Sequence, residues 1–114
     1  MDDKAREKIQ DLQVLEHNLQ SLLMQKQNLN IELSETENAI FEINKTTDSI
    51  YKMIGSIIVS VDKAKTLEEL EEKKKLIGLR NSSVEKQEKS ISLRATDLQN
   101  EIKKLLENSS SASK

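Results

Sequence analysis

The chain has 114 residues, of which 33% are charged and 35% hydrophobic, with one Tyr, one Phe and no Trp, Pro or Cys. A compact globule of this length needs a thick core with aromatic contributors, so the composition argues instead for long helices or a coiled coil. The lack of cysteine excludes disulfides, thiolate metal sites and cysteine nucleophiles. The formal net charge of −2 argues against a protein whose affinity comes from neutralising phosphates.

The sequence carries no signal for a membrane or a secretory route. No apolar run reaches the roughly 18 residues of a membrane span, and the polar N-terminal segment MDDKAREKIQ is unlike a secretory signal. The absence of cysteine fits a reducing compartment. We therefore expect a cytoplasmic protein.

The first predicted element is a long helix over residues 3–45. Apolar residues recur there in alternating steps of three and four, which is the heptad pattern of a coiled coil. Heptad position a holds Ala5, Leu12, Leu19, Leu33 and Ile40, and position d holds Leu15, Leu22, Leu29 and Ile43. Polar exceptions are Lys8, Lys26 and Thr36.

Residues 49–62 follow as a predicted β-hairpin, after poor helix formers at residues 44 and 46–49. Two strand-like runs, 50–54 and 57–61, flank Gly55. The second strand is apolar on both faces, so both faces should be buried against other residues. An isolated two-stranded hairpin has only marginal stability in water. We therefore expect the hairpin to join the same element of other chains. The assembly residues would be Ile50, Tyr51, Met53, Gly55, Ile57, Ile58, Val59 and Val61. The alternative is a hairpin folded back onto its own coiled coil, with Phe41 and the Ile43–Leu67 layer covering one face.

A second helix is predicted over residues 66–107, and its start is read as a capping box of Thr66 and Glu69. Position a holds Leu67, Ala95 and Ile102, and position d holds Leu70, Ile77, Val84, Ile91, Leu98 and Leu105, with Lys74, Asn81 and Glu88 as polar exceptions. The tail, residues 108–114, is small and polar, and we expect it to be disordered.

The two helices are expected to pair as an antiparallel hairpin within one domain of residues 1–114. One register sets Ile43 opposite Leu67 and Leu12 opposite Leu98, and it brings Lys26 close enough to pair with Glu88. The predicted fold class is therefore mainly α: a long antiparallel two-helix coiled coil with one central β-hairpin that joins an intersubunit β-barrel.

This plan resembles the β-type subunits of the prefoldin family. The matching segments are Gln25-Lys26-Gln27, Glu32-Leu33-Ser34-Glu35, Tyr51-Lys52-Met53-Ile54-Gly55-Ser56-Ile57-Ile58-Val59 and Glu85-Lys86-Gln87-Glu88-Lys89. The hairpin segment is the most specific of them. The resemblance implies a hetero-hexamer of two α-type and four β-type subunits, whose hairpins form β-barrels. It also implies an ATP-independent chaperone that captures unfolded proteins at the coiled-coil tips and delivers them to a group II chaperonin.

A chaperone of this kind needs apolar side chains that remain in water. Six apolar residues fall outside the heptad seam toward the tips, and we expect them to bind clients: Ile9, Val14, Leu23, Met24, Leu93 and Leu106. The alternative is that scattered exposed leucines are ordinary and that e positions partly cover the seam. A second off-seam group in mid-shaft, Ile31, Leu76 and Leu79, has no assigned role.

Other functions find less support in the sequence. It has no phosphate loop, catalytic residue set or metal-ligand spacing, so we expect no enzyme, cofactor or metal site. His17 has no Cys or second His that could bind a metal with it. RNA binding requires a stripe of basic residues, whereas acidic and basic residues alternate along this sequence. The main alternative is a coiled-coil scaffold or tether without client binding. Self-assembly of this chain alone also stays open.

Overall fold

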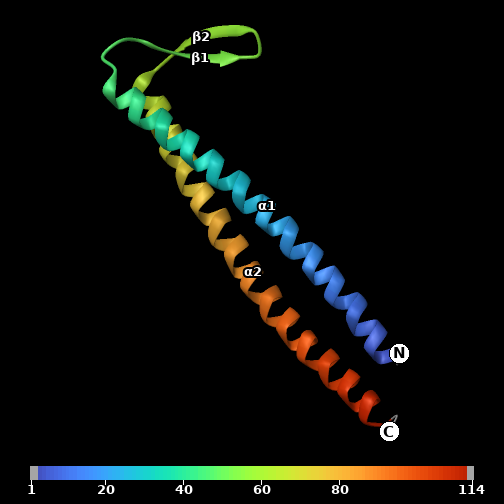
Figure 1. Cartoon of the computed structure of the whole chain (residues 1–114). Coiled ribbons are helices and arrows are strands. Elements are labelled where there is room, and N and C mark those ends of the chain that lie inside the picture. The colour runs from blue at the N-terminus through green and yellow to red at the C-terminus, as the bar shows by residue number, and fades with distance from the viewer. Residues whose placement is uncertain (1–2, 113–114) are drawn as a thin grey trace. The chain divides into compact units, whose positions relative to one another are not determined.

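The computed structural model describes residues 3–112 of the chain. Within them lie helix α1 (Asp3–Lys45), strands β1 (Ile50–Ile54) and β2 (Ile57–Val61), and helix α2 (Lys63–Ala112) (Figure 1). The predicted class, two long helices with one β-hairpin between them, is confirmed. The described residues pack as two compact units. Residues 3–26 and 83–112 form the terminal unit, and residues 27–82 form the hairpin unit.

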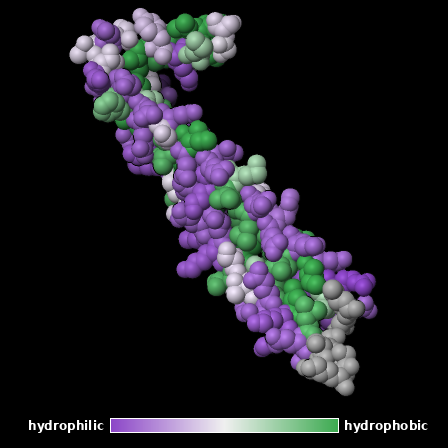
Figure 2. All heavy atoms as spheres, viewed as in Figure 1, coloured by the Kyte–Doolittle hydropathy of each residue, from purple (hydrophilic) through white to green (hydrophobic). Residues whose placement is uncertain are grey.

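Each unit is held together by the heptad seam. The terminal unit buries Ala5, Leu22, Val84, Ala95, Leu98 and Ile102, and the hairpin unit buries Leu29, Thr36 and Ile77. All of these side chains occupy predicted a or d positions. Figure 2 shows hydrophobic side chains as a stripe between hydrophilic ones along the helices. The seam follows from the 3.5-residue repeat, because only those positions return to the partner helix on every turn.

Polar residues within the seam find partners either across it or within their own helix. In the terminal unit Lys26 Nζ lies 3.6 Å from Glu88 Oε1 and 3.8 Å from Glu85 Oε1, which confirms the expected Lys26–Glu88 pair. Lys8 Nζ lies 2.6 Å from Glu101 Oε2. In the hairpin unit the Thr36 hydroxyl donates to the carbonyl of Glu32 at 2.7 Å, so burying it leaves no unpaired donor. The ion pairs of Lys8 and Lys26, which join the two helices, fit the predicted antiparallel register.

Helix α2 begins three residues earlier than the sequence suggested. The Asp62 carboxylate caps it by accepting the Lys65 backbone N–H at 2.9 Å. The predicted capping box of Thr66 and Glu69 is wrong, because the Thr66 hydroxyl already lies inside the helix and donates to the carbonyl of Asp62 at 2.7 Å. Asp62 follows directly on β2, so the negative charge meets the positive end of the helix as soon as the chain turns.

The far end of α2 also extends beyond the predicted bound. Where a disordered tail was expected from Asn108 onward, α2 continues to Ala112, and the last two residues lie outside the described part. Extending an existing helix fixes the backbone of one residue for each new hydrogen bond, whereas starting a helix fixes several residues for its first hydrogen bond and so costs more conformational entropy. A short run of Asn, Ser and Ala can therefore remain helical when it continues a helix that is already formed.

The hairpin is a two-stranded antiparallel sheet with a tight turn. Ile54 pairs with Ile57, and Ile50 pairs with Val61 at the open end. Gly55 has φ +60° and no other described residue has a positive φ, which matches a type II′ turn with glycine first. The base of the hairpin is tied down by the Lys63 ammonium, which donates to the carbonyl of Thr46 just after α1.

Candidate functional site

The β-hairpin presents two different faces. Residues paired across the strands share a face. By this pairing one face, called the inner face, consists of Ile50, Lys52, Ile54, Ile57, Val59 and Val61, and the outer face consists of Tyr51, Met53, Ile58 and Ser60. All inner-face residues except Ile57 line a groove against the helices of the unit, and Tyr51 also borders it. Ile58 therefore lies opposite the other apolar residues of β2, as the sequence predicted.

Both faces leave large apolar side chains in water. On the outer face Tyr51, Met53 and Ile58 are 64%, 71% and 63% exposed. On the inner face Ile50, Val59 and Val61 are half-buried, but Ile54 and Ile57 at the turn are exposed. The alternative in which the hairpin folds back onto its own helices thus accounts for part of the inner face only. In a two-stranded sheet each strand also has one edge whose backbone groups are unpaired.

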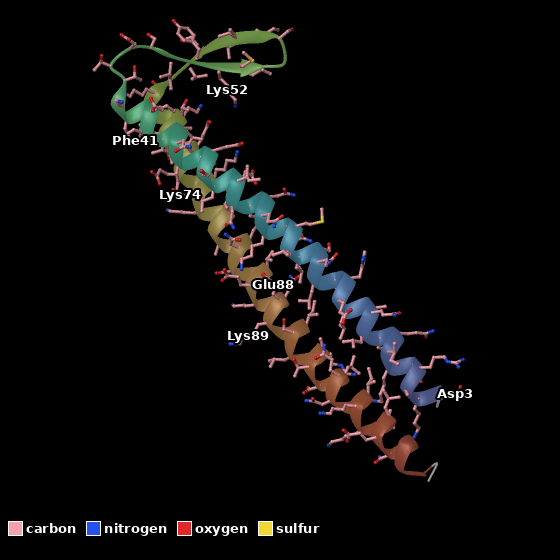
Figure 3. The ribbon with its side chains drawn as sticks, viewed as in Figure 1. Asp3, Phe41, Lys52, Lys74, Glu88 and Lys89 are labelled. Atoms are coloured by element: carbon pink, nitrogen blue, oxygen red, sulfur yellow. The ribbon has the colours of Figure 1, made fainter. Side chains whose placement is uncertain are left out.

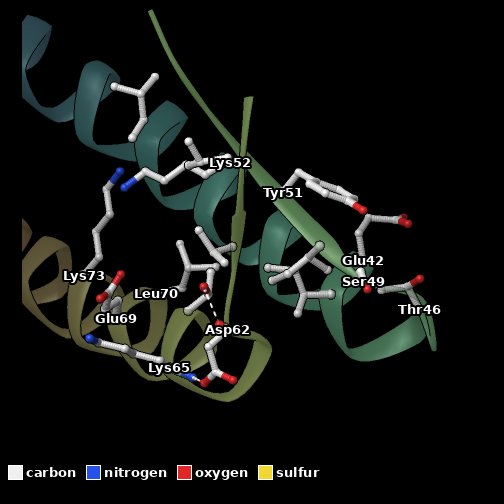
Figure 4. Close-up of a pocket in the computed structure, with 16 residues that line it drawn as sticks. Glu42, Thr46, Ser49, Tyr51, Lys52, Asp62, Lys65, Glu69, Leu70 and Lys73 are labelled. Carbon is white, nitrogen blue, oxygen red and sulfur yellow. Dashed lines mark hydrogen bonds between the residues drawn. The ribbon is translucent and has the colours of Figure 1, made fainter. Parts of the chain in front are cut away.

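A groove runs between the inner face and the ends of the two helices (Figure 4). Its apolar wall combines Ile50, Ile54, Val59 and Val61 of the hairpin with Ile43 and Leu70 of the helices. Its charged residues are Glu42, Lys52, Asp62, Lys65, Glu69 and Lys73. Both signs are equally represented, so the groove as a whole is neither acidic nor basic.

Phe41, which the sequence offered as a cover for the hairpin, is exposed on α1. It lies beneath Lys45, whose Nζ is 5.8 Å from the ring centroid, a cation–π distance. Figure 3 shows Phe41 on the outside of the helix end. Ile43 and Leu67 are half-buried in the seam, and the groove reaches Ile43.

The predicted client-binding residues lie in the terminal unit, outside its seam. Five of the six are strongly exposed: Val14, Leu23, Met24, Leu93 and Leu106, at 45–64%. Ile9 differs, because it is half-buried beside the seam. Position e flanks the a/d stripe, so a residue there is partly covered by the partner helix. The first and last described residues, 3 and 112, belong to this unit, whereas the hairpin belongs to the other.

The mid-shaft group is also exposed and belongs to the hairpin unit. Ile31, Leu76 and Leu79 are 57%, 50% and 68% accessible. Nearby, Asn81 Nδ2 donates to Asn30 Oδ1 at 3.3 Å. Because they are exposed to a similar extent but belong to the other unit, these three residues serve as a comparison group for the apolar residues of the terminal unit.

One ion pair at the edge of the seam was not predicted from the sequence. Lys8 was read only as a polar exception, yet its ammonium contacts Glu101 at the edge of the seam. The hydrogen bond from Lys8 and its positive charge hold the pKa of Glu101 below its ordinary value of 4.5. Sequence could have suggested the pair, because the antiparallel register sets the two residues nearly opposite each other.

Two further kinds of site, a metal-ligand cluster and a membrane-spanning helix, are absent from the described residues. Within residues 3–112 no three His, Cys, Asp or Glu side chains are grouped as metal ligands, and His17 is exposed on α1. In the same range neither helix has an apolar stretch that could cross a membrane.

The comparisons with known proteins agree on one family. The model of the prefoldin subunit family matches residues 6–109. Prefoldin subunit beta of Thermococcus onnurineus is 41% identical over 56 residues, covering 49% of this chain and 48% of that protein. The same subunit of Sulfurisphaera tokodaii is 34% identical over 56 residues, covering 49% and 45%. These alignments thus span about half the length of each relative.

A solved structure extends the likeness to nearly the whole fold. The crystal structure of the prefoldin beta subunit from Thermococcus strain KS-1 superposes with a TM-score of 0.83 at 29% identity. The superposition covers 92% of this chain and 94% of that one.

Proposed function

Because this chain belongs to the prefoldin subunit family, we propose that it is a β-type subunit of an ATP-independent chaperone. In this proposal its hairpin assembles with other prefoldin subunits, two α-type and four β-type in all. The helix ends that carry the termini bind unfolded proteins and deliver them to a group II chaperonin. The complex works in the cytoplasm.

The observation that carries the proposal is the hairpin with apolar side chains exposed on both faces. Tyr51, Met53 and Ile58 on one face, with Ile54 and Ile57 on the other, are each 57–71% exposed, and apolar side chains gathered in water in this way are typical of an interaction site. The free strand edges offer backbone donors and acceptors to a neighbouring strand. A tether built only on heptads would have no use for such an element.

Client binding is supported by a different kind of surface in the terminal unit. Its exposed apolar residues sit on helices whose backbone groups are already paired, so they offer contact area without directional bonds. Met24 adds a flexible, polarisable side chain that adapts to many partners. Such a surface suits unfolded chains, which share exposed apolar groups and little else.

The client surface is tested by changing Val14, Met24 and Leu93 together to Gln, which keeps good helix propensity while removing the apolar surface. The variant should assemble with the other subunits as before, because none of these residues touches the seam or the hairpin. It should, however, suppress the aggregation of a denatured client much less than the unchanged complex does.

The matched control is the variant with Ile31, Leu76 and Leu79 changed to Gln. It removes as many exposed apolar side chains from the same helices but from the hairpin unit. We expect its suppression of aggregation to stay near the unchanged level. Equal loss in both variants would mean that apolar surface anywhere on the helices is sufficient, and unchanged suppression in both would remove the client-binding assignment.

Assembly is tested separately, by light scattering of the chain alone and after mixing with an α-type prefoldin subunit. A stable complex of about six chains is expected from the mixture. A coiled-coil dimer that ignores the α-type subunit would favour the scaffold or tether instead.

A further inference from the structure

Lys52 stands apart from the rest of the hairpin. Of the ten residues in β1 and β2 it is the one that carries a charge. It lies on the inner face, where it is paired across the strands with Val59 and flanked by Ile50 and Ile54. Figure 3 shows it projecting from β1 on the side of the helices. An assembly that covers the apolar groups of this face therefore covers a lysine as well.

Among the residues that the structure describes, Lys52 has no ion-pair partner. Lys52 makes no hydrogen bond or ion pair with any residue in the range 3–112. In the groove its ammonium points toward Lys73, a group of the same sign (Figure 4). Of the three acids that line the groove, Asp62 caps α2, and neither Glu42 nor Glu69 forms an ion pair with Lys52. In the free chain this costs nothing, because Lys52 is exposed and hydrated.

Covering the inner face would change that balance. An ammonium withdrawn from water without a carboxylate is strongly unfavourable, whereas one that meets a carboxylate with good geometry is tolerated. The occupant of this face must therefore bring an acidic side chain to Lys52. A second copy of this hairpin cannot do so, because residues 50–61 contain no Asp and no Glu. Two copies placed together could add only like charge.

We infer that Lys52 selects a non-identical neighbour: the hairpin strand of a different prefoldin subunit that carries an Asp or Glu facing it. This rests on the proposed function, and it specifies the chemistry of the partner. Apolar contacts on the two faces supply attraction to any similar hairpin. Lys52 makes pairing with a copy of itself unfavourable and pairing with an acidic strand favourable, which is how interfaces discriminate between partners.

The first test maps the contact directly. The full chain and the α-type subunit are mixed, treated with a carbodiimide that joins amines to touching carboxylates without a spacer, and digested for mass spectrometry. We expect a crosslink between Lys52 and an Asp or Glu in a strand of the partner. A crosslink from Lys52 to Glu42 or Glu69 of its own chain, and to nothing in the partner, would overturn the inference.

The second test uses the substitution Lys52→Met, which keeps the length of the stem and removes the charge. Because it would leave the partner's carboxylate buried and unpaired, affinity for the α-type subunit should fall at least about 100-fold. Self-association of the variant should rise, since the like charges are gone. Lys52→Arg should keep most of the affinity for the partner. Lys89→Met on α2, where Figure 3 shows a lysine pointing away from the helices, should change neither.

The two proposals fail in different ways. If Lys52→Met binds the α-type subunit as tightly as the unchanged chain does, the selection role of Lys52 is refuted while the assembly stands. If the unchanged chain forms no complex with the α-type subunit at all, the proposed function is refuted, and the role of Lys52 with it. Circular dichroism of each variant establishes that the helices remain folded.

Discussion

Leu93 and Leu98 on α2 give a sharp test of which surface holds the helices together. They are the same residue type five positions apart in one helix, but Leu98 is 1% exposed and Leu93 is 62% exposed. Leu98→Ala removes a side chain that is almost wholly buried in the seam of the terminal unit. Leu93→Ala removes one that water already surrounds.

The expected loss of stability follows from that difference. Leu→Ala in a core costs about 2–5 kcal/mol, and the cost grows with the cavity that remains. A two-helix seam is open on both sides, so neighbouring side chains can move in, and we place Leu98→Ala near the lower end, at about 2–3 kcal/mol. For Leu93→Ala the change should stay within about 0.5 kcal/mol, because alanine is an equally good helix former.

Urea unfolding followed by far-ultraviolet circular dichroism measures both variants at one protein concentration. Leu98→Ala should shift the midpoint downward with an unchanged slope, and Leu93→Ala should leave it in place. The aggregation-suppression assay should respond in the opposite order, with Leu93→Ala showing the larger loss. Equal destabilisation by both changes would refute the heptad assignment of α2.

Two further predictions follow from the backbone and from an ion pair. An added Cβ meets no atom within 4 Å at either Gly55 or Gly78, so thermal unfolding should show Gly78→Ala stabilising its helix by about 0.5–1 kcal/mol. Gly55→Ala should instead cost the hairpin about 1–2 kcal/mol, because of its φ of +60°, and should weaken assembly. A gain from both changes would contradict the assigned turn. Since Lys8 holds the pKa of Glu101 below 4.5, that pair stabilises the fold above the ordinary Glu pKa, and the contribution is lost as the pH falls through the folded-state pKa. NMR titration should find the Glu101 pKa raised in Lys8→Met, and an identical pKa in both proteins would show that the contact does not persist in solution.

The helices were predictable because their signal is repeated. A wrong heptad assignment would have placed charged residues at positions where the structure buries Ala5, Ile77 or Leu98. Each further heptad therefore gives an independent test of the same assignment. The Lys26–Glu88 pair followed from that register with no further information. The hairpin was predictable from a different signal: two runs rich in β-branched residues, separated by a short turn with glycine, are typical of a β-hairpin.

The errors occurred where a single local choice decided the outcome. Asp62 and Thr66 are both good N-cap residues, and pattern alone favoured Thr66 because Glu69 completes a capping box. What decides in favour of Asp62 is that β2 ends at Val61, which leaves the chain free to turn at once. The exposure of a position beside the seam also depends on local packing: Ile9 is half-buried, as the alternative that such positions partly cover the seam allows, and its role in client binding stays a prediction.

The two apolar surfaces of this chain differ in what they leave unsatisfied, and this explains why they would serve different partners. Strand edges expose backbone donors and acceptors at fixed spacing, so a partner must match their register, and Lys52 adds a demand for charge. The off-seam residues of the terminal unit project from helices whose backbone is already paired, so they demand nothing but apolar area. The proposed function therefore assigns selective pairing to the hairpin and tolerance of many client sequences to the helix ends. Moving a charge such as that of Lys52 onto the position of Met24 would cost client binding without creating a preference among clients.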